Sequence, residues 1–404
     1  MERMTQDPWI SVIGIGDDGP DGLTPAARAR LDAARLVVGG PRHLGMIERP
    51  ERGLAWASPI GDTLPGIEAA RPGPVAVLAS GDPSWFGGAK LFGRYVESGE
   101  AEILPSVSSF QIAAARLGWP LERTACLSAC GRPVENVWPH LRPGARLIVL
   151  SSGPKTAGEL ADGLKARGYG ASAMWIMAHL GGDEERISAT RADAFEDGNV
   201  LPLNLIALEC ALDEGRVFIP RVPGLPDEAF TTDGTMTKRI LRAAAISALA
   251  PREGDHLWDV GAGSGSIAVE WLRAAAGSTA TAVEPREDRR ALIAANATAL
   301  CVAGLSIVAG QAPECFADLP EPDAVFFGGG LSEEGAEIAL SRLKAGGRLV
   351  AHGVTLETQG LICDLHARHG GELQRIGVET AEPLGRYRGW RGAMPVLHWH
   401  WTRS

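Results

Sequence analysis

The residues best suited to hold a ligand stand in a glycine-rich stretch in the second half of the chain. An apolar run ends at Asp259, and glycine then occupies every second position from 261 to 265, followed by apolar residues at helical spacing. This pattern predicts a strand, a tight turn and a helix. Glycines let a backbone pass close beneath a ligand, and a helix N-terminus favours polar or anionic groups. An ordinary glycine-rich turn of an α/β domain is the alternative.

Glu284 favours a ligand site over an ordinary glycine-rich turn. It ends a second predicted strand, residues 280–283, roughly 20 residues beyond the glycines, where an acidic residue typically holds ribose hydroxyls. The spacing G-x-G-x-G favours S-adenosylmethionine over NAD, whose oxidoreductases carry G-x-G-x-x-G. A solvated glutamate and an NAD-dependent oxidoreductase remain alternatives, and a test of NAD binding separates the second.

The amino-acid composition argues against several classes of binding partner. A net charge of −10 leaves no basic excess to neutralise nucleic-acid phosphates. No apolar run approaches the roughly 20 residues that span a bilayer, and no basic-then-apolar signal opens the sequence. The six cysteines are scattered, and the closest, Cys126 and Cys130, form no C-x-x-C pair. We therefore expect a cytoplasmic protein with no nucleic-acid, membrane or metal site.

The elements that must position these residues alternate between strand and helix. This alternation predicts an α/β protein, with a mainly parallel sheet in its second half and ligands at the carboxyl ends of the strands. The tail, residues 372–401, is predicted as two strands around a loop rich in Arg and Gly, which gives an antiparallel edge. Residues 216–226 contain three prolines and a glycine, typical of a semi-rigid link. We therefore expect a first domain at 1–215, a linker at 216–230 and a second domain at 231–404.

Several motifs of the first half stand in the order found in the tetrapyrrole methylases. They are Val-Ile-Gly-Ile-Gly at 12–16, Ala-Ser-Gly-Asp-Pro at 79–83, Pro-Ser-Val-Ser-Ser at 105–109, His-Leu-Gly-Gly-Asp-Glu-Glu at 179–185 and Pro-Leu-Asn at 202–204. Residues 9–210 resemble that family on these motifs.

The second half resembles the other methyltransferase family of corrin synthesis. The resemblance rests on Pro-Gly-Leu-Pro-Asp at 223–227, Met-Thr-Lys at 236–238, the stretch 259–265, Glu284 and three glycines at 328–330. A chain with both halves in this order resembles the family of decarboxylating precorrin-6Y C5,15-methyltransferases over almost its whole length.

This resemblance implies a fold and a reaction. The fold is a two-lobed tetrapyrrole-methylase domain followed by a Rossmann-like methyltransferase domain, each with its own S-adenosylmethionine. The reaction is methylation of precorrin-6B at C5 and C15 with loss of the C12 acetate carboxyl group, giving precorrin-8X in cobalamin biosynthesis. The family pattern gives C5 methylation to the first domain and the C15 reaction with decarboxylation to the second. It also suggests a homo-oligomer. A different tetrapyrrole acceptor and a non-catalytic S-adenosylmethionine sensor are the competing hypotheses.

The resemblance also implies which residues hold the cofactor. In the second domain the turn would pass beneath its amino-acid part, Glu284 would accept the ribose hydroxyls, Thr237 would contact it and Gln311 with Ala312 would lie near the adenine. In the first domain Gly14 and Gly16 would allow close approach, Asp82 would hold the amino group, and Ser108 with Ser109 would reach the carboxylate or ribose. The full set is Gly14, Gly16, Asp82, Ser108, Ser109, Asn204, Thr237, Gly261, Ala262, Gly263, Ser264, Gly265, Glu284, Gln311 and Ala312. The alternatives are a turn-forming Asp82, a structural amide at Asn204, a surface threonine at 237 and an ordinary loop at 311–312.

A substrate with many carboxylates requires local cations. Arginine pairs with carboxylates through two hydrogen bonds, and tryptophan can stack on a macrocycle. The candidate substrate-binding residues are Lys238, Arg239, Arg386, Arg388, Trp390 and Arg391. The run 386–391 is equally compatible with a solvated loop. No residue emerges as the catalytic acid for decarboxylation. Cys130 stands where relatives often carry histidine, and His352 stands where they carry a small residue, so the resemblance assigns neither a catalytic role.

Overall fold

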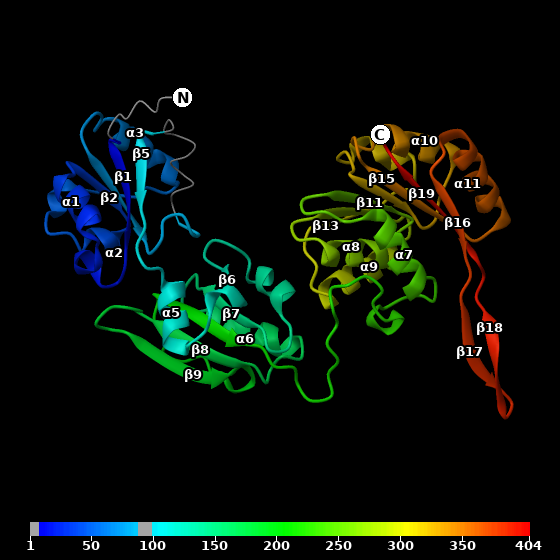
Figure 1. The fold of residues 1–404 in the computed structure, drawn as a ribbon, viewed down its shortest axis with the longest axis horizontal. Coiled ribbons are helices and arrows are strands. Elements are labelled where there is room, and N and C mark those ends of the chain that lie inside the picture. Colours follow the sequence, from blue (N-terminus) through cyan, green and yellow to red (C-terminus); the bar gives the residue numbers. More distant parts are fainter. Residues whose placement is uncertain (1–7, 88–98) are drawn as a thin grey trace. The chain divides into compact units, whose positions relative to one another are not determined.

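The computed structural model describes residues 8–87 and 99–404. The chain divides into two compact units, Met1–Phe218 and Ile219–Ser404, called unit 1 and unit 2 below (Figure 1). The boundary lies within the proline-rich stretch that the sequence predicts as a linker.

Unit 1 has two lobes, each built on a five-stranded sheet. The first lobe has the strand order β3-β2-β4-β1-β5, and all neighbouring strands are parallel. Every residue of β1 is buried, as expected for a central strand of a parallel sheet. The described elements of this lobe are β1 (Ile10–Ile15), α1 (Pro25–Ala33), β2 (Leu36–Gly39), α2 (Pro41–Leu44), β3 (Gly53–Ala55), α3 (Leu64–Glu68), β4 (Val75–Ser80) and β5 (Ala101–Leu104).

The second lobe has a mixed sheet with the order β6-β7-β10-β8-β9. Only β6 and β7 are parallel, because β10 runs antiparallel to β7 and β8, and β9 runs antiparallel to β8. The edge strand β9 is largely exposed and polar, so it carries no apolar signal in the sequence. The elements are α5 (Ser109–Leu117), β6 (Thr124–Ser128), β7 (Arg146–Leu150), α6 (Thr156–Ala166), β8 (Ala173–Ala178), β9 (Arg186–Arg191) and β10 (Asn204–Glu209).

Unit 2 is organised around a seven-stranded sheet with the order β13-β12-β11-β14-β15-β19-β16. The first five strands are parallel, and β19 runs antiparallel to both of its neighbours. The predicted α/β class and the antiparallel edge are confirmed. The elements are α7 (Arg239–Leu249), β11 (His256–Val260), α8 (Ser266–Ala274), β12 (Thr279–Val283), α9 (Glu287–Ala299), β13 (Leu305–Val308), β14 (Ala324–Phe327), α10 (Glu333–Arg342), β15 (Arg348–Gly353), α11 (Leu356–His369), β16 (Glu372–Ile376), β17 (Glu379–Leu384), β18 (Tyr387–Gly392) and β19 (Val396–Thr402).

Side-chain alternation along the strands builds a core on each face of this sheet. Leu257 and Phe326 pack with α7 and α8, whereas their neighbours Trp258 and Phe327 pack with α10 and α11. Successive strand residues point to opposite faces, so both faces must be apolar when helices cover both. The sheet is therefore closed on its faces, and its strand ends remain available for a site.

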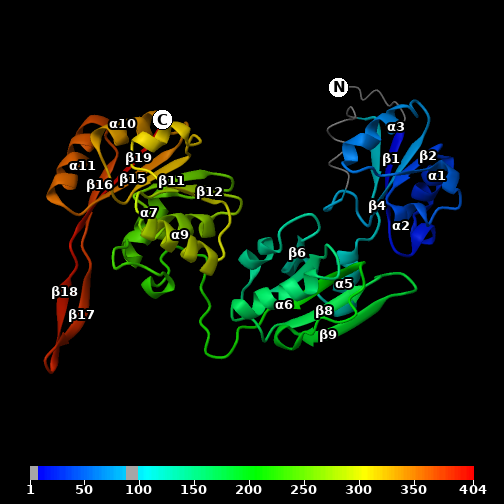
Figure 2. The same cartoon turned by 180° about the vertical axis from the view of Figure 1, so that it is seen from behind.

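The tail differs from the predicted pair of strands around a loop. The Arg- and Gly-rich segment itself forms an antiparallel ribbon, β17 with β18, which projects beyond the body of unit 2 in both views (Figures 1 and 2). Few apolar residues mark these strands, since most of their side chains are exposed.

The stretch following Phe218 is packed onto unit 2. Leu225 and Phe230 are buried against Val269 and Leu300. The Gly224 and Leu225 amides donate to the buried Glu270 carboxylate at 2.6 and 3.0 Å. These contacts give residues 219–230 a fixed place on unit 2. Among the described residues, no helix has both the length and the apolar character needed to cross a membrane.

Candidate functional site

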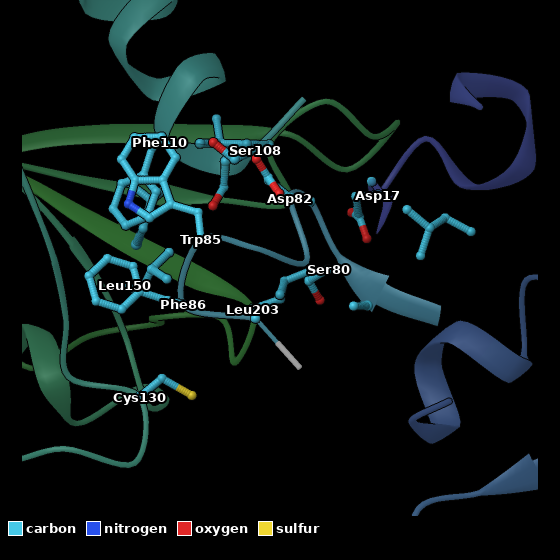
Figure 3. Close-up of a pocket in the computed structure, with 18 of the residues that line it drawn as sticks. Asp17, Ser80, Asp82, Trp85, Phe86, Ser108, Phe110, Cys130, Leu150 and Leu203 are labelled. Atoms are coloured by element: carbon cyan, nitrogen blue, oxygen red, sulfur yellow. The ribbon is translucent and has the colours of Figure 1, made fainter. Parts of the chain in front are cut away.

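A cavity of about 470 Å³ lies between the lobes of unit 1 (Figure 3). The carboxyl ends of β1 and β4, the N-terminus of α5 and the loop before β10 contribute to its wall. Five of the predicted residues line it: Gly16, Asp82, Ser108, Ser109 and Asn204. The fold therefore gathers, from four separate motifs, residues that the sequence could only place on separate loops.

Asn204 presents the most informative polar atom of this wall. Its amide nitrogen donates to the Leu201 carbonyl at 2.7 Å. Its Oδ1 is buried and has no hydrogen-bond partner among the described residues. A buried acceptor without a donor is costly, and a ligand N–H or O–H removes that cost. Asn204 therefore carries an acceptor that lacks a donor among the described residues, and the residue itself lines the cavity.

Asp82 and Ser108 already have structural partners. Asp82 Oδ1 accepts hydrogen bonds from the Ser84 amide at 2.8 Å and the Ser84 hydroxyl at 2.6 Å. Ser108 forms a capping box at the start of α5, in which its hydroxyl accepts from the Gln111 amide at 3.4 Å. Both residues shape the loop, as the turn-forming alternative for Asp82 requires, and both line the cavity.

Gly14 serves loop packing beside the cavity. A Cβ there would lie 1.9 Å from the Gly81 carbonyl oxygen and 2.7 Å from the Ser106 nitrogen. The residue is absent from the cavity lining. Its lack of a side chain lets β1 and two neighbouring loops approach one another.

A row of polar residues, which the sequence analysis did not select, crosses from one lobe to the other. Asp17 Oδ2 lies 2.8 Å from Nδ1 of His179, and its Oδ1 accepts from Arg42 at 2.8 Å. Arg42 also contacts His43 at 2.9 Å, and His43 contacts the Ser80 hydroxyl at 3.0 Å. Burial, together with the nearby Arg42 charge, lowers the pKa of His43 to about 4, so this ring is neutral near pH 7.

Aromatic rings form another part of the cavity wall. The ring centroids of Trp85 and Phe110 are 4.9 Å apart, and the Arg132 guanidinium lies 4.7 Å from the Phe86 centroid. Figure 3 shows these rings gathered on one side of the view and Asp17 on the other. Cys130 lines the same cavity and is exposed. The site therefore combines an aromatic wall with a charged one.

The glycine turn of unit 2 has the backbone that its sequence predicts. Gly261, Gly263 and Gly265 have φ values of 68, 59 and 74°. A Cβ at Gly261 would lie 2.6 Å from the Gly329 carbonyl oxygen, whereas one at Gly263 would meet only the Thr235 carbonyl at 3.8 Å. Gly261 therefore brings the turn against the glycines at 328–330, whereas a Cβ at Gly263 would lie at ordinary van der Waals distance from the Thr235 carbonyl oxygen.

Acidic residues support this turn from below. Glu284, which is buried, accepts from the Gly263 amide at 2.9 Å and the Arg286 amide at 3.1 Å. Asp259 accepts from the Ala268 amide at 3.0 Å, and its burial raises the pKa of its carboxyl to about 7. The Ser264 hydroxyl is buried without a partner among the described residues, and Ala262 lies within the same turn.

The other predicted cofactor residues of unit 2 have varied surroundings. Thr237 is half-buried, and its carbonyl accepts from Arg242 at 2.6 Å in the segment leading to α7. Gln311 is exposed after β13. Ala312 is buried in the core with Phe316.

The predicted substrate-binding residues fall into two groups. Lys238 and Arg239 are exposed at the start of α7, where Arg239 Nε donates to the Gly224 carbonyl at 2.8 Å. Arg386, Arg388, Trp390 and Arg391 lie at the tip and along β18 of the projecting ribbon. The predicted loop is thus a strand, and these residues extend away from the sheet that carries the glycine turn. Among residues 8–87 and 99–404, no group of three or more His, Cys, Asp or Glu is placed to hold a metal ion.

Comparison of the sequence with known proteins identifies its relatives. Residues 10–196 match the tetrapyrrole (corrin/porphyrin) methylases, and residues 228–403 match the precorrin methyltransferase domain. A decarboxylating precorrin-6Y C(5,15)-methyltransferase from Sinorhizobium is 45% identical over 400 residues, which cover 98% of this chain and 97% of the relative. The chain belongs to this family.

The family predicted from the sequence is therefore confirmed. It comprises decarboxylating C-methyltransferases of cobalamin biosynthesis, which sets aside the oxidoreductase and sensor alternatives. Two further relatives each match less than half of the chain. A probable cobalt-precorrin-6B C(15)-methyltransferase (decarboxylating) from Pyrobaculum calidifontis is 38% identical, covering 43% of this chain and 93% of the relative. A cobalt-precorrin-7 C(5)-methyltransferase from Salmonella typhimurium is 34% identical, covering 46% and 94%.

Proposed function

We propose that the two units divide the family's reaction, with C5 methylation in unit 1 and C15 methylation with decarboxylation in unit 2. The proposal gives each unit one S-adenosylmethionine site and takes precorrin-6B to precorrin-8X with loss of the C12 acetate carboxyl group. It draws support from the two short relatives, which are named for the two reactions separately and each have the size of about one unit.

The residues present in unit 1 fit such a cofactor. The unpartnered Asn204 Oδ1 on the cavity wall is the observation that carries the proposal for this unit. S-adenosylmethionine has an adenine amine and ribose hydroxyls that can donate to it. The aromatic wall suits its flat base, because rings stack on π-faces.

The residues present in unit 2 fit the same cofactor in another way. Three left-handed glycines form the turn at the end of β11, and Gly263, which is half-buried, would meet nothing closer than 3.8 Å if it carried a Cβ. Glu284 lies at the end of β12, beside the turn. When bound, S-adenosylmethionine supplies an electrophilic methyl group. The protein's own part is then to place the acceptor carbon in line with that group, and positioning contributes most of the rate.

The charges of the proposed substrate sites suit a polycarboxylate. Arg42 and Arg132 line the cavity of unit 1. Lys238 and Arg239 are exposed and closely follow Thr235, whose carbonyl lies beside Gly263 of the glycine turn. Arginine binds carboxylates through paired hydrogen bonds, so these side chains can fix the orientation of the macrocycle. The ribbon residues 386–391 are proposed to contact the substrate periphery, within a homo-oligomer.

Calorimetry and product mass on the full chain test the division. We expect two cofactor equivalents per chain. Asn204→Leu removes the unpartnered acceptor of unit 1, and Glu284→Ala removes the carboxylate beside the turn of unit 2; each lowers the affinity of one site by about tenfold or more. At a cofactor concentration below the weakened Kd, N204L then accumulates a product with one added methyl and without one carboxyl group, whereas E284A slows carbon dioxide release about tenfold or more. Equal loss of both methyl groups in N204L contradicts the division.

A further inference from the structure

His179 begins one of the sequence motifs of unit 1 but has no role in the function proposed above. It directly follows β8, and its side chain lines the cavity. Its backbone has φ of 52°, which is uncommon for a residue other than glycine. The His179 amide donates to the Leu203 carbonyl at 3.2 Å, and its carbonyl accepts from the Gly182 amide at 3.0 Å. The fold thus holds this imidazole in place at the cost of a strained backbone.

Asp17 fixes the orientation of the His179 ring. The carboxylate comes from the loop after β1, on the opposite lobe, and lies 2.8 Å from Nδ1. Its other oxygen accepts from Arg42 at 2.8 Å. An ionised carboxylate only accepts, so Nδ1 donates, and the lone pair of the neutral ring is on Nε2. An imidazole oriented by a carboxylate in this way is the arrangement of a general base.

Charged groups face the His179 ring from two sides. Asp17 faces Nδ1 from the first lobe, with Arg42 and His43 of α2 beyond it. Glu184, on the loop following His179, has a carboxylate oxygen 4.0 Å from Nε2 and a side chain that is 72% exposed. An ion pair at Nε2 with Glu184 is therefore weak and easily displaced by a substrate.

We propose that His179 accepts the proton that C5 of the macrocycle releases during methylation in unit 1. This inference rests on the proposed function. C5 forms its bond to the methyl carbon with an electron pair from the macrocycle, while the carbon–sulfur pair leaves on sulfur. C5 then holds both a methyl group and a hydrogen. The C–H bond breaks, its electron pair returns to the conjugated ring, and the proton binds Nε2.

Deuterium exchange at C5 tests the proton step without methyl transfer. The full chain is incubated in D₂O with S-adenosylhomocysteine and the substrate that has already undergone the C15 reaction. Exchange requires a deuteron to add to C5 in place of the methyl group, using an electron pair of the macrocycle, and the deuterated Nε2 of His179 supplies it. C5 then holds both hydrogen and deuterium, the C–H electron pair returns to the conjugated ring, the proton binds the neutral Nε2, and mass and NMR spectra record the exchange. We expect exchange with the unchanged chain, and a rate at least about 100-fold lower in His179→Asn.

His179→Asn keeps an amide donor that can reach Asp17 but has no second ring nitrogen. Asparagine also tolerates the left-handed backbone, so the variant separates positioning from proton transfer. His140→Asn is the matched control, because His140 belongs to the second lobe and lies outside the cavity lining. We expect exchange, methylation and cofactor affinity to be unchanged in H140N.

His179→Gly provides a second, independent readout. Glycine accepts the backbone conformation and leaves space for a free imidazole. We expect added imidazole to restore C5 methylation in H179G and to have no effect on H140N. Exchange and methylation by H179N within threefold of the unchanged chain would overturn the proposal, as would failure of imidazole to rescue H179G while its cofactor affinity is normal. Failure of the proposed function looks different, since N204L would then leave C5 methylation intact.

Discussion

The two units build their sites from different parts of the polypeptide. In unit 1, side chains from both lobes converge on a cavity, so that Asp17 meets His179 across 162 positions of sequence. In unit 2, one turn exposes its own backbone, and the contacts of Glu284 with Gly263 and Arg286 span only 21 and 2 positions. A site built from the backbone of one turn depends on the positions of its glycines. A site built from side chains of two lobes depends on how those lobes pack together.

Substitutions in the glycine turn are expected to have the largest effect. Gly261→Ala places a methyl group 2.6 Å from a backbone oxygen at a left-handed φ, so both overlap and backbone strain oppose it. We expect the free energy of unfolding of unit 2 to fall by about 3 kcal/mol or more.

Gly263→Ala is the matched control for that change. It has the same left-handed φ but no contact closer than 3.8 Å, so a loss of about 1 kcal/mol is expected. Denaturant unfolding of the full chain, followed by probes of each unit, measures both. Equal losses in the two variants would show that backbone conformation alone, and not the approach to Gly329, sets the requirement.

The Asp259 carboxyl predicts a pH dependence confined to unit 2. Burial raises its pKa from the ordinary value of 3.8 to about 7, so the folded state binds the proton more tightly than the unfolded state. The stabilisation is therefore fully present below about pH 4 and is lost as the pH rises towards 7, by a few kcal/mol at most.

Asp259→Asn keeps an acceptor for the Ala268 amide and cannot ionise. Four histidines of unit 2, whose pKa values burial lowers, make stability rise with pH in the same range in both proteins: His256, His352, His398 and His400. We therefore expect the unit 2 stability of D259N to rise more steeply between pH 4 and 7 than that of the unchanged chain, and the difference between the two curves measures the Asp259 contribution. Thermal unfolding at a series of pH values compares them, and parallel curves would contradict a titrating Asp259.

In unit 1, substitution of a single loop residue is expected to lower the stability by less. Ser108→Ala removes the hydroxyl cap of α5, which costs about 1 kcal/mol. Because that hydroxyl is already used by the Gln111 amide, we expect the cofactor affinity to change less than threefold. Calorimetry that finds a larger loss of affinity would give Ser108 a direct part in cofactor binding.

The smallest effect on stability is expected on the projecting ribbon. Arg391 pairs with Glu382 at 3.1 Å, with side chains 78% and 46% exposed. Such exposed pairs contribute less than about 0.5 kcal/mol, so Arg391→Gln should leave unfolding almost unchanged. If the ribbon contacts the carboxylates of the substrate, KM rises several-fold at constant kcat. An unchanged KM would remove the ribbon from the substrate site.

The difference between a local turn in unit 2 and a cavity between two lobes in unit 1 explains which features could be predicted from the sequence. The strands of the unit 2 sheet are apolar runs, and the glycine turn between β11 and α8 follows a local pattern, so neither needs distant information. The ribbon β17–β18 and the strand β9 were not predicted because their exposed residues carry no apolar signal. Trp85 and Phe110 read as ordinary apolar residues until the fold places both on one cavity wall.

By itself the sequence determined the α/β class, the glycine turn and, through its ordered motifs, the family. These properties follow from local chemistry, since φ preference, apolar periodicity and residue spacing act over a few positions. The tertiary structure alone decided that Asp17 orients His179, that Asn204 keeps an unpaired oxygen and that burial raises the pKa of Asp259. Each of these depends on what surrounds an atom in space, because desolvation and hydrogen bonding act between groups that the chain brings together only when it folds.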